Sequence, residues 1–174
     1  NVTDTDKITV ATTGSEADFA DLRVGARMGG AGGASNGTLL FCCGGRAASG
    51  RIDSKEYFTI ASASTGTDAG DLDKAKSTGT LGATDQEGYM ISSVARAVYF
   101  RGNSSSAVME FMTVASEGNA SSFGDATVAR TSMSGWSDGT RGEFAGGDNE
   151  GGSSTNGSDV IDKITIATED DAAD

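Results

Sequence analysis

The chain contains no histidine and no proline, and only 2 cysteines and 6% aromatic residues occur among its 174 residues. Histidine is the commonest general base, the usual partner of a catalytic serine and the commonest zinc ligand. Its absence makes enzyme chemistry an unfavourable starting hypothesis. We expect no catalytic residue, no metal site and no cofactor.

Positive charge is also scarce, because 13 lysines and arginines face 25 acidic residues and the net charge is −12. Such a chain repels nucleic-acid backbones and anionic membranes, so neither is an expected partner. No apolar run approaches the roughly 18 residues of a membrane span. A basic segment followed by an apolar stretch is also missing, so we predict neither a membrane span nor a signal peptide.

Glycine is present in excess, with 26 residues, together with many serine, threonine and alanine residues. This composition is compatible with disorder, because small polar residues bury too little surface to offset chain entropy. It is equally compatible with a β-fold that has many tight turns. The pattern along the chain separates the two interpretations.

One short phrase of alternating apolar and small residues occurs four times. The copies occupy residues 8–12, 58–62, 112–116 and 164–168. Their central threonines, at positions 9, 59, 113 and 165, are separated by 50, 54 and 52 residues. A polar residue or two precedes each copy. Alternation with a period of two predicts a half-buried β-strand in every copy.

The neighbours of this phrase repeat in the same order. A segment containing an aspartate follows about ten residues later, at Asp21, Asp71 and Asp125. A turn and a strand then close each unit, with hairpin signals at Asn36-Gly37 and Asp138-Gly139. In the second copy, we place the turn at residues 84–88 and the strand at 89–94. A disordered chain does not keep such an order at constant spacing.

Each unit therefore offers about four short strands. We predict an all-β fold, a β-propeller-like array of about three four-stranded repeats of about 50 residues. Residues 1–174 form a single repeat domain in this prediction. Its units are 1–50, 51–103 and 104–156, with a terminal half-repeat at 157–174.

The two ends of the chain are near-duplicates of each other. Ile8 and Val10 match Ile164 and Ile166, so one strand type is present once more than the others. One hypothesis is strand exchange between chains, in which these residues form assembly strands that cover an unpaired edge. Two alternatives remain open: the chain is a fragment of a longer repeat protein, or the half-repeat simply caps an edge.

The ordered set of motifs also resembles a known family. The residues that carry the resemblance are 118–125 (Gly-Asn-Ala-x-x-Phe-Gly-Asp), 128–130 (Val-Ala-Arg), 140–147 (Thr-Arg-Gly-x-Phe-x-Gly-Gly) and 162–168 (Asp-x-Ile-Thr-Ile-Ala-Thr). Together they resemble the kelch-like repeats of tailed-phage virion proteins, especially those of cyanophages and other marine phages. The resemblance implies a component of a tail, fibre or capsid exterior, and it does not imply catalysis.

Several single residues invite a functional interpretation. Trp136 and Tyr89 are the candidate ligand contacts, because aromatic rings stack on sugars and anchor interfaces. Trp136 falls where earlier copies have Ala34 and Ala83. We favour a core or subunit-interface role for Trp136 over contact with a glycan.

The other candidates have a structural explanation. We expect the repeated aspartates to accept backbone hydrogen bonds in turns, and Arg130 and Arg141 to pair with such carboxylates between repeats. The adjacent Cys42 and Cys43 fit two small residues of a strand whose side chains point to opposite faces.

The sequence thus predicts a non-enzymatic virion structural protein that assembles through the edges of its β-repeats. Its expected partners are further copies of itself and other virion proteins, and its expected location is the virion or the extracellular space. The alternative is a receptor-binding module that recognises a host-surface polysaccharide.

Overall fold

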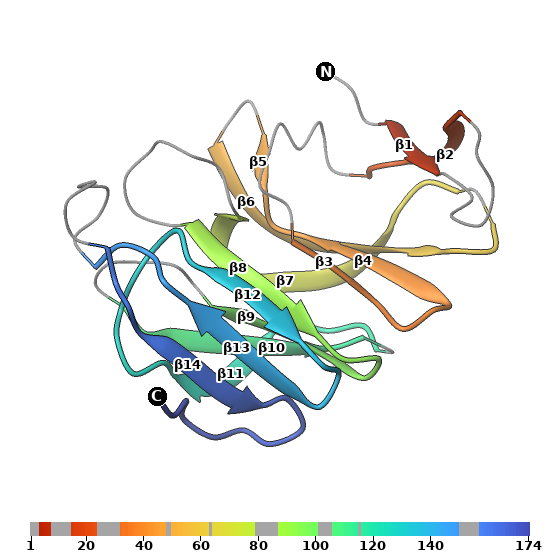
Figure 1. Cartoon of the computed structure of the whole chain (residues 1–174). Coiled ribbons are helices and arrows are strands. Elements are labelled where there is room, and N and C mark those ends of the chain that lie inside the picture. Colours follow the sequence, from red (N-terminus) through yellow and green to blue (C-terminus); the bar gives the residue numbers. More distant parts are fainter. Residues whose placement is uncertain are drawn as a thin grey trace.

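A computed structural model describes residues 4–7, 15–23, 32–47, 50–62, 64–78, 87–100, 106–114, 116–149 and 157–174. The described residues form fourteen strands and no helix (Figure 1). The predicted all-β class is therefore confirmed. The strand order of the described residues closes no barrel or ring.

The strands follow one another as antiparallel hairpins and meanders. β1 (Asp4–Lys7) and β2 (Ala17–Asp21) form an N-terminal hairpin. The first meander contains β3 (Gly32–Ser35), β4 (Leu39–Cys43), β6 (Gly50–Thr59) and β7 (Thr67–Thr78), with β5 (Arg46–Ala47) paired to β6. The second contains β8 (Glu87–Ser92), β9 (Arg96–Phe100), β10 (Val108–Thr113) and β11 (Ser121–Asp125). The third contains β12 (Ser134–Ser137), β13 (Arg141–Ala145) and β14 (Ile161–Thr165).

The first two meanders join into one 9-stranded sheet through a short parallel pairing of β7 with β8. Among the described residues, two pairs form this link, Ser77 with Glu87 and Thr78 with Gly88. The third meander is a separate 3-stranded sheet. In each meander the third strand ends at the second residue of the repeated phrase, and the later described residues of the phrase lie in the turn that follows, so the strand predicted over each copy is only partly right. The meanders are consequently offset from the predicted units, and residue 51 falls inside β6.

One hairpin turn recurs in all three meanders and fixes their alignment. The side chains of Asn36, Ser93 and Asp138 each accept a bond from the backbone N–H two residues later, at 2.9, 3.2 and 2.9 Å. Asn, Ser and Asp favour turns because their short polar side chains reach these amides. Residues 84–86 of the turn predicted at 84–88 lie outside the described residues, and its last two residues are not part of a turn. Glu87 and Gly88 already belong to β8, and the second turn begins at Ser93.

The core lies between the meanders. We call the side of each meander that contacts the next one its front face, and the opposite side its rear face. On the first meander, the front face contains Ala34, Phe41 and Cys43, which pack in one cluster with the rear-face residues Ala97, Tyr99 and Met112 of the second meander. The second meander is thus buried on both sides, and β9 is buried from Ala97 to Phe100.

The same packing repeats one step further along the chain. The front-face residues Ile91, Val98 and Phe100 cluster with the rear-face residues Phe144, Ile164 and Ile166 of the third meander. Phe100 and Phe144 meet edge to face, with ring centroids 5.6 Å apart. A smaller cluster joins Phe19 of β2 to Phe58 on the rear face of the first meander. The array therefore consists of faces stacked in chain order.

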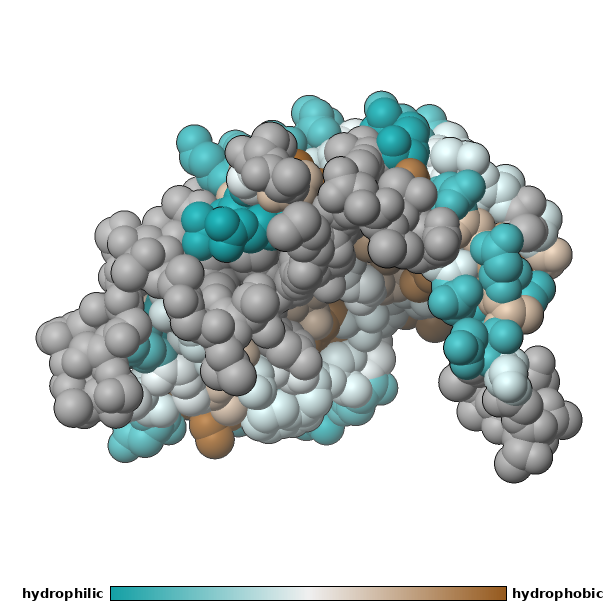
Figure 2. Space-filling model, turned by 90° about the horizontal axis from the view of Figure 1, so that it is seen from above, coloured by the Kyte–Doolittle hydropathy of each residue, from teal (hydrophilic) through white to brown (hydrophobic). Residues whose placement is uncertain are grey.

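Figure 2 shows teal and white residues over most of the described part of one face, with small separate brown areas. This distribution agrees with the acidic composition, since scattered apolar residues are normal on a protein surface.

Candidate functional site: the junctions between repeats

An acidic side chain lies two residues before each copy of the repeated phrase. Glu56, Glu110 and Asp162 are buried, with exposures of 0%, 2% and 0%, whereas Asp6 is exposed. The three buried carboxylates lie on the rear faces of their meanders, because they alternate with front-face residues along β6, β10 and β14. Burial of a carboxylate is costly unless hydrogen-bond donors replace its water.

The preceding repeat supplies such a donor in each case. The bonds run from the Arg23 N–H to Glu56 Oε2 (2.7 Å), from the Asp73 N–H to Glu110 Oε2 (2.9 Å) and from the Thr127 N–H to Asp162 Oδ1 (3.0 Å). Every donor is the second residue after a repeated aspartate, Asp21, Asp71 or Asp125. One side-chain-to-backbone bond therefore joins each repeat to the one before it.

The repeated aspartates take part in the same junctions through their backbones. The carbonyls of Asp21, Asp71 and Asp125 accept the N–H groups of Gly66, Ala120 and Ala172 at 2.8, 2.9 and 2.8 Å. Two of the aspartate N–H groups are also bound, Asp71 by Asn119 Oδ1 at 3.1 Å and Asp125 by Asp171 Oδ1 at 2.9 Å. The three carboxylates themselves are exposed. The feature that repeats at this position is a backbone contact.

A bulge brings this backbone into reach. In each of the hairpins β1–β2, β6–β7 and β10–β11, the register shifts immediately before the acid, at Asp6, Glu56 and Glu110. Gly70 and Gly124 lie opposite the shift with positive φ, 94° and 148°. A Cβ on either would lie 2.6 Å from backbone atoms of the next repeat, at Gly118 and Asp170 respectively. These two glycines permit a close backbone approach that a larger residue would block.

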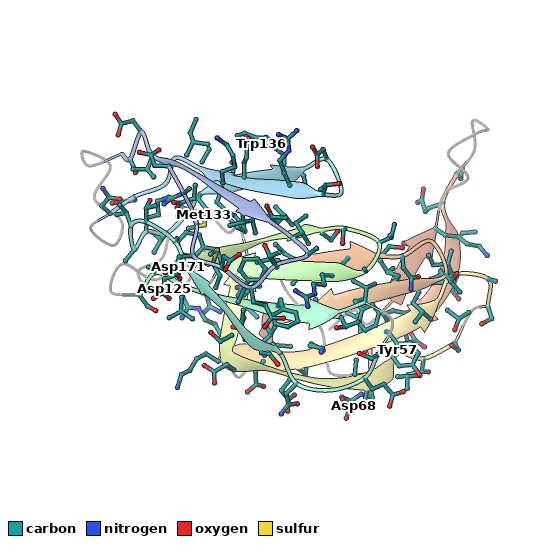
Figure 3. All side chains as sticks on the ribbon, turned by 90° about the horizontal axis from the view of Figure 1, so that it is seen from below. Tyr57, Asp68, Asp125, Met133, Trp136 and Asp171 are labelled. Carbon is teal, nitrogen blue, oxygen red and sulfur yellow. The ribbon has the colours of Figure 1, made fainter. Side chains whose placement is uncertain are left out.

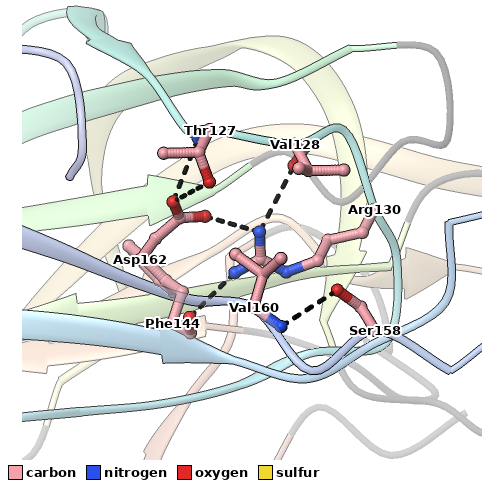
Figure 4. A network of polar contacts seen from close by, with 7 residues as sticks. All are labelled: Thr127, Val128, Arg130, Phe144, Ser158, Val160 and Asp162. Carbon is pink, nitrogen blue, oxygen red and sulfur yellow. Dashed lines mark hydrogen bonds and ion pairs between the residues drawn. The ribbon is translucent and has the colours of Figure 1, made fainter. Parts of the chain in front are cut away.

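The junction between the second and third meanders also contains a buried ion pair (Figure 4). Arg130 and Asp162 are both fully buried and form a salt bridge. The guanidinium also donates to the carbonyls of Phe144 at 2.8 Å and Val128 at 3.3 Å, and it lies over the Phe100 ring. The prediction paired Arg130 with one of the repeated aspartates. The structure pairs it instead with Asp162, the acid that precedes the repeated phrase.

The junction between the first and second meanders contains a buried lysine instead. Lys55 is 1% exposed, and its Nζ donates to the carbonyl of Gly118 in the next repeat. Burial lowers the pKa of Lys55 below its ordinary value of 10.5, partly opposed by nearby acidic groups such as Asp71 and Glu110. The third repeat has Ile161 at this position, and the second has Met109. The lysine therefore ties the two repeats together at a position that is apolar elsewhere.

The predicted assembly residues have different placements in the two terminal strands. Ile164 and Ile166 are buried in the core of their own chain, at 4% and 1% exposure. The backbone of β14 also pairs with Ala173 along its outer edge. Ile8 and Val10 lie outside the described residues. Strand exchange through these residues therefore stays a prediction, and Ile164 and Ile166 are already packed within their own chain.

The two aromatic candidates are not brought together in the described part of the chain. Trp136 is 50% exposed on β12 and points away from the rest of the molecule (Figure 3). Tyr89 belongs to β8, but its side chain lies outside the described residues. Counted from the hairpin turns, Trp136 corresponds to Ala34, as predicted, and to Ile91, whereas the predicted match Ala83 lies outside the described residues.

The remaining predictions concern Arg141 and the cysteines. Arg141 pairs with Asp138 of its own turn at 3.3 Å, so the predicted pairing between repeats is wrong for this residue. The N–H groups of Arg141 and Thr140 lower the pKa of Asp138 below its ordinary value. Cys42 and Cys43 are free thiols of β4 that face opposite clusters, as predicted.

The central feature of the site was missed by reasoning from the sequence. Polar residues precede every copy of the phrase, but the acid that all four copies share was not singled out. The available signal was that Asp6, Glu56, Glu110 and Asp162 occupy one repeat position beside apolar strand residues. An acidic side chain on a strand with apolar residues must either face solvent or receive a hydrogen bond from a buried donor.

Other chemistry in the described ranges is sparse. No group of three or more histidine, cysteine, aspartate or glutamate residues there is arranged to hold a metal ion. A cavity of about 250 Å³ lies beside Lys55, between β10 and the loop that includes Glu117 and Asn119. The lysine amine that borders it already donates to the Gly118 carbonyl. No helix long and apolar enough to cross a membrane occurs in the described chain.

No model of a protein family matches the chain. No curated protein matches its sequence significantly.

Proposed function

We propose that this chain is a non-enzymatic structural protein of a virion, located on a tail, a fibre or the capsid exterior. The observation that carries the proposal is the junction that recurs between successive repeats. A buried acid binds the preceding backbone, and apolar faces close over it. Such junctions resist separation, which is what a mechanical component requires, and the motif resemblance supplies the virion context.

A propeller-like arrangement fits these contacts. The first strands of the three meanders, β3, β8 and β12, lie beside one another. Their remaining strands follow in antiparallel order, as do the strands of propeller blades from the axis outwards. The described meanders would then be about three successive blades of an array, with further blades supplied by assembly.

A non-enzymatic role is supported by how the buried polar groups are used. Three buried carboxylates, those of Glu56, Glu110 and Asp162, accept hydrogen bonds from backbone N–H groups. Arg130 forms a salt bridge with Asp162, and Lys55 donates a hydrogen bond to a backbone carbonyl. These groups are engaged in joining repeats. The expected partners are copies of the same chain and other virion proteins.

Immunogold labelling of tailed-phage particles purified from the source of the gene tests the proposal. Antibodies against the purified chain are expected to decorate the tail, the fibres or the capsid exterior. Particles that contain the chain by mass spectrometry serve as the specimen, and particles from an unrelated phage serve as the control. Absence of the chain from the particles would overturn the virion assignment.

A second candidate is host-polysaccharide binding, favoured by the surroundings of Trp136. Glu143 pairs directly with Trp136 across β12 and β13, and Lys163 pairs with Glu143 across β13 and β14. An exposed ring beside a carboxylate and an ammonium group is a suitable sugar platform. In this case Trp136→Ala abolishes retention on immobilised host polysaccharide, whereas Val94→Ala, in an exposed turn, leaves it unchanged.

A further inference from the structure

Large exposed hydrophobic side chains occur at five described positions. They are Leu40 (36%), Ile60 (42%), Val94 (73%), Trp136 (50%) and Ile161 (45%). Val94 lies in a hairpin turn. The other four lie on two sheet faces at opposite ends of the array: Leu40 and Ile60 on the rear face of the first meander, and Trp136 and Ile161 on the front face of the third.

The repeat shows how the rear-face positions are normally covered. Leu40 corresponds to Ala97 and Gly142, each the second residue after its turn and each buried. Ile60 corresponds to Val114 and Ile166, because the backbone N–H of each donates a hydrogen bond of 2.9 Å to an equivalent carbonyl. In each meander this carbonyl belongs to the residue just before the second strand, which is β4, β9 or β13. Val114 and Ile166 are 0% and 1% exposed. The backbone hydrogen bond at this position is the same in the three meanders, whereas the meander that covers the face differs.

On the front faces too, equivalent residues are buried where another meander covers them. Trp136 corresponds to Ala34 and Ile91, both 4% exposed beneath the next meander in the chain. Ile161 corresponds to Lys55 and Met109, which are 1% and 0% exposed. An apolar residue at these positions is therefore buried wherever another meander comes next.

We infer that the front face of the third meander binds the rear face of the first meander of a second copy. This inference rests on the stacking of repeats in the proposed function and extends it from one chain to two. The junction between the second and third meanders shows which residues would meet. There, a Cβ on Gly142, the equivalent of Leu40, would contact the side chain of Ile91, the equivalent of Trp136. The equivalent contact between copies joins Trp136 of one chain to Leu40 of the other.

The two faces differ in residues, so the joint is heterologous and repeats from copy to copy. Such joints build rings when the rotation closes and fibres when it does not. Trp136 and Leu40 are bulkier than Ile91 and Gly142, so the meanders at this joint lie further apart than those inside the chain. The N-terminal hairpin covers only part of the receiving face, where Phe19 contacts Phe58 with ring centroids 6.4 Å apart.

A second copy explains the exposed residues better than a sugar does. A glycan platform accounts for Trp136 but leaves Leu40, Ile60 and Ile161 without a reason to be exposed. Exposed apolar residues gathered on one face commonly mark protein interfaces. One repeat-to-repeat joint accounts for Trp136, Leu40 and Ile60, whereas the place that β14 and Ile161 would take on the receiving face is occupied by β1 of the receiving chain.

Sedimentation velocity of wild type, Leu40→Asp, Trp136→Asp and Val94→Asp tests the inference. High ionic strength is needed, because the net charge of −12 opposes association. Wild type and Val94→Asp are expected to associate equally. Val94→Asp is the control because it adds the same negative charge as the two interface variants, but at a turn that belongs to neither face. Leu40→Asp and Trp136→Asp should each weaken association about tenfold or more, because a carboxylate is buried without a partner.

The decisive sample is a mixture of the two interface variants. Leu40→Asp keeps an intact front face, and Trp136→Asp keeps an intact rear face. A head-to-tail joint therefore predicts a one-to-one dimer in the mixture, with nothing larger, while each variant alone stays monomeric. Far-ultraviolet circular dichroism checks that both variants retain the β-fold.

Three results would overturn the joint. They are a monomeric wild type at every concentration, an equal loss in Val94→Asp, or a mixture that stays monomeric. A monomeric wild type that binds polysaccharide through Trp136 would assign the face to a glycan instead. Failure of the joint alongside positive virion labelling leaves the structural role intact, whereas association without labelling overturns the role and keeps the joint.

Discussion

The side chain of Glu110 accepts a hydrogen bond from the backbone N–H of Asp73, 37 residues earlier in the chain, at 2.9 Å. The two residues belong to adjacent meanders, so this bond is a connection between repeats. Its counterparts at Glu56 and Asp162 have the same donor position and similar lengths. The stability of the array is therefore expected to depend on a few buried groups at repeated places.

Replacement of Glu110 by alanine tests the repeated bond. Glu110→Ala removes the acceptor and leaves a backbone amide unsatisfied, which costs about 1–3 kcal/mol of unfolding free energy. The matched control is Asp6→Ala, at the same repeat position but exposed, with an expected change below about 0.5 kcal/mol. Urea unfolding gives both values. Equal losses in the two variants would show that burial of the acid is unimportant.

The ion pair between Arg130 and Asp162 gives the largest expected effect. Asp162→Ala leaves a fully buried guanidinium without its counter-ion, at a cost of about 3–5 kcal/mol. The double variant Arg130→Met with Asp162→Leu is expected to recover most of this loss, because both charges are then absent. Asp159→Ala, an exposed acid nearby, is the control. A double variant no more stable than Asp162→Ala would contradict the assigned cause.

Two glycines with positive φ separate backbone strain from crowding between repeats. Gly139→Ala imposes only the unfavourable backbone conformation, about 1–2 kcal/mol, because nothing lies within 4 Å of its Cβ direction. Gly70→Ala adds a collision with the backbone of Gly118, and we expect about 1–3 kcal/mol more. Thermal or urea unfolding compares the two. Equal losses would indicate that the repeats do not approach closely at Gly70.

Lys55 gives a pH dependence with a definite sign. Its pKa is lowered in the folded chain, so between that lowered value and 10.5 the unfolded chain binds more protons. Stability therefore rises with pH across this window, and the gain is complete above 10.5. Below the lowered value, both states are protonated and the contribution is constant.

Comparison with Lys55→Met isolates this contribution. Methionine is suitable because Met109 occupies the equivalent buried position in the second meander. The difference in unfolding free energy, wild type minus variant, is expected to increase from neutral to alkaline pH. A difference that stays flat or decreases over this range would show that burial does not lower the lysine pKa.

Much of the fold could be predicted because repetition amplifies weak local signals. Alternation in the phrase placed a strand at the end of the third strand of each meander, but it did not give the extent of that strand. Asn36-Gly37 and Asp138-Gly139 predicted two of the three turns. The turn at Ser93 was misplaced because valine comes after serine there, and the usual glycine signal is missing. Its serine side chain makes the same backbone contact as the asparagine and the aspartate.

The junctions were harder to predict because they depend on pairs of residues far apart in the sequence. Nothing local indicates that Glu56 binds the amide of Arg23, or that Lys55 binds the carbonyl of Gly118. The exposure of Trp136 likewise depends on whether another meander covers its sheet, since Ile91 at the same repeat position is buried. Strands and turns are encoded locally, whereas the packing of faces decides which side chains are hidden.

Cryo-electron microscopy of the purified protein at high ionic strength shows directly whether copies join front face to rear face. Head-to-tail joining predicts closed rings or regular fibres in which Trp136 of each copy is buried against Leu40 of the next. Compact monomers at every concentration, with both residues exposed to solvent, would contradict it.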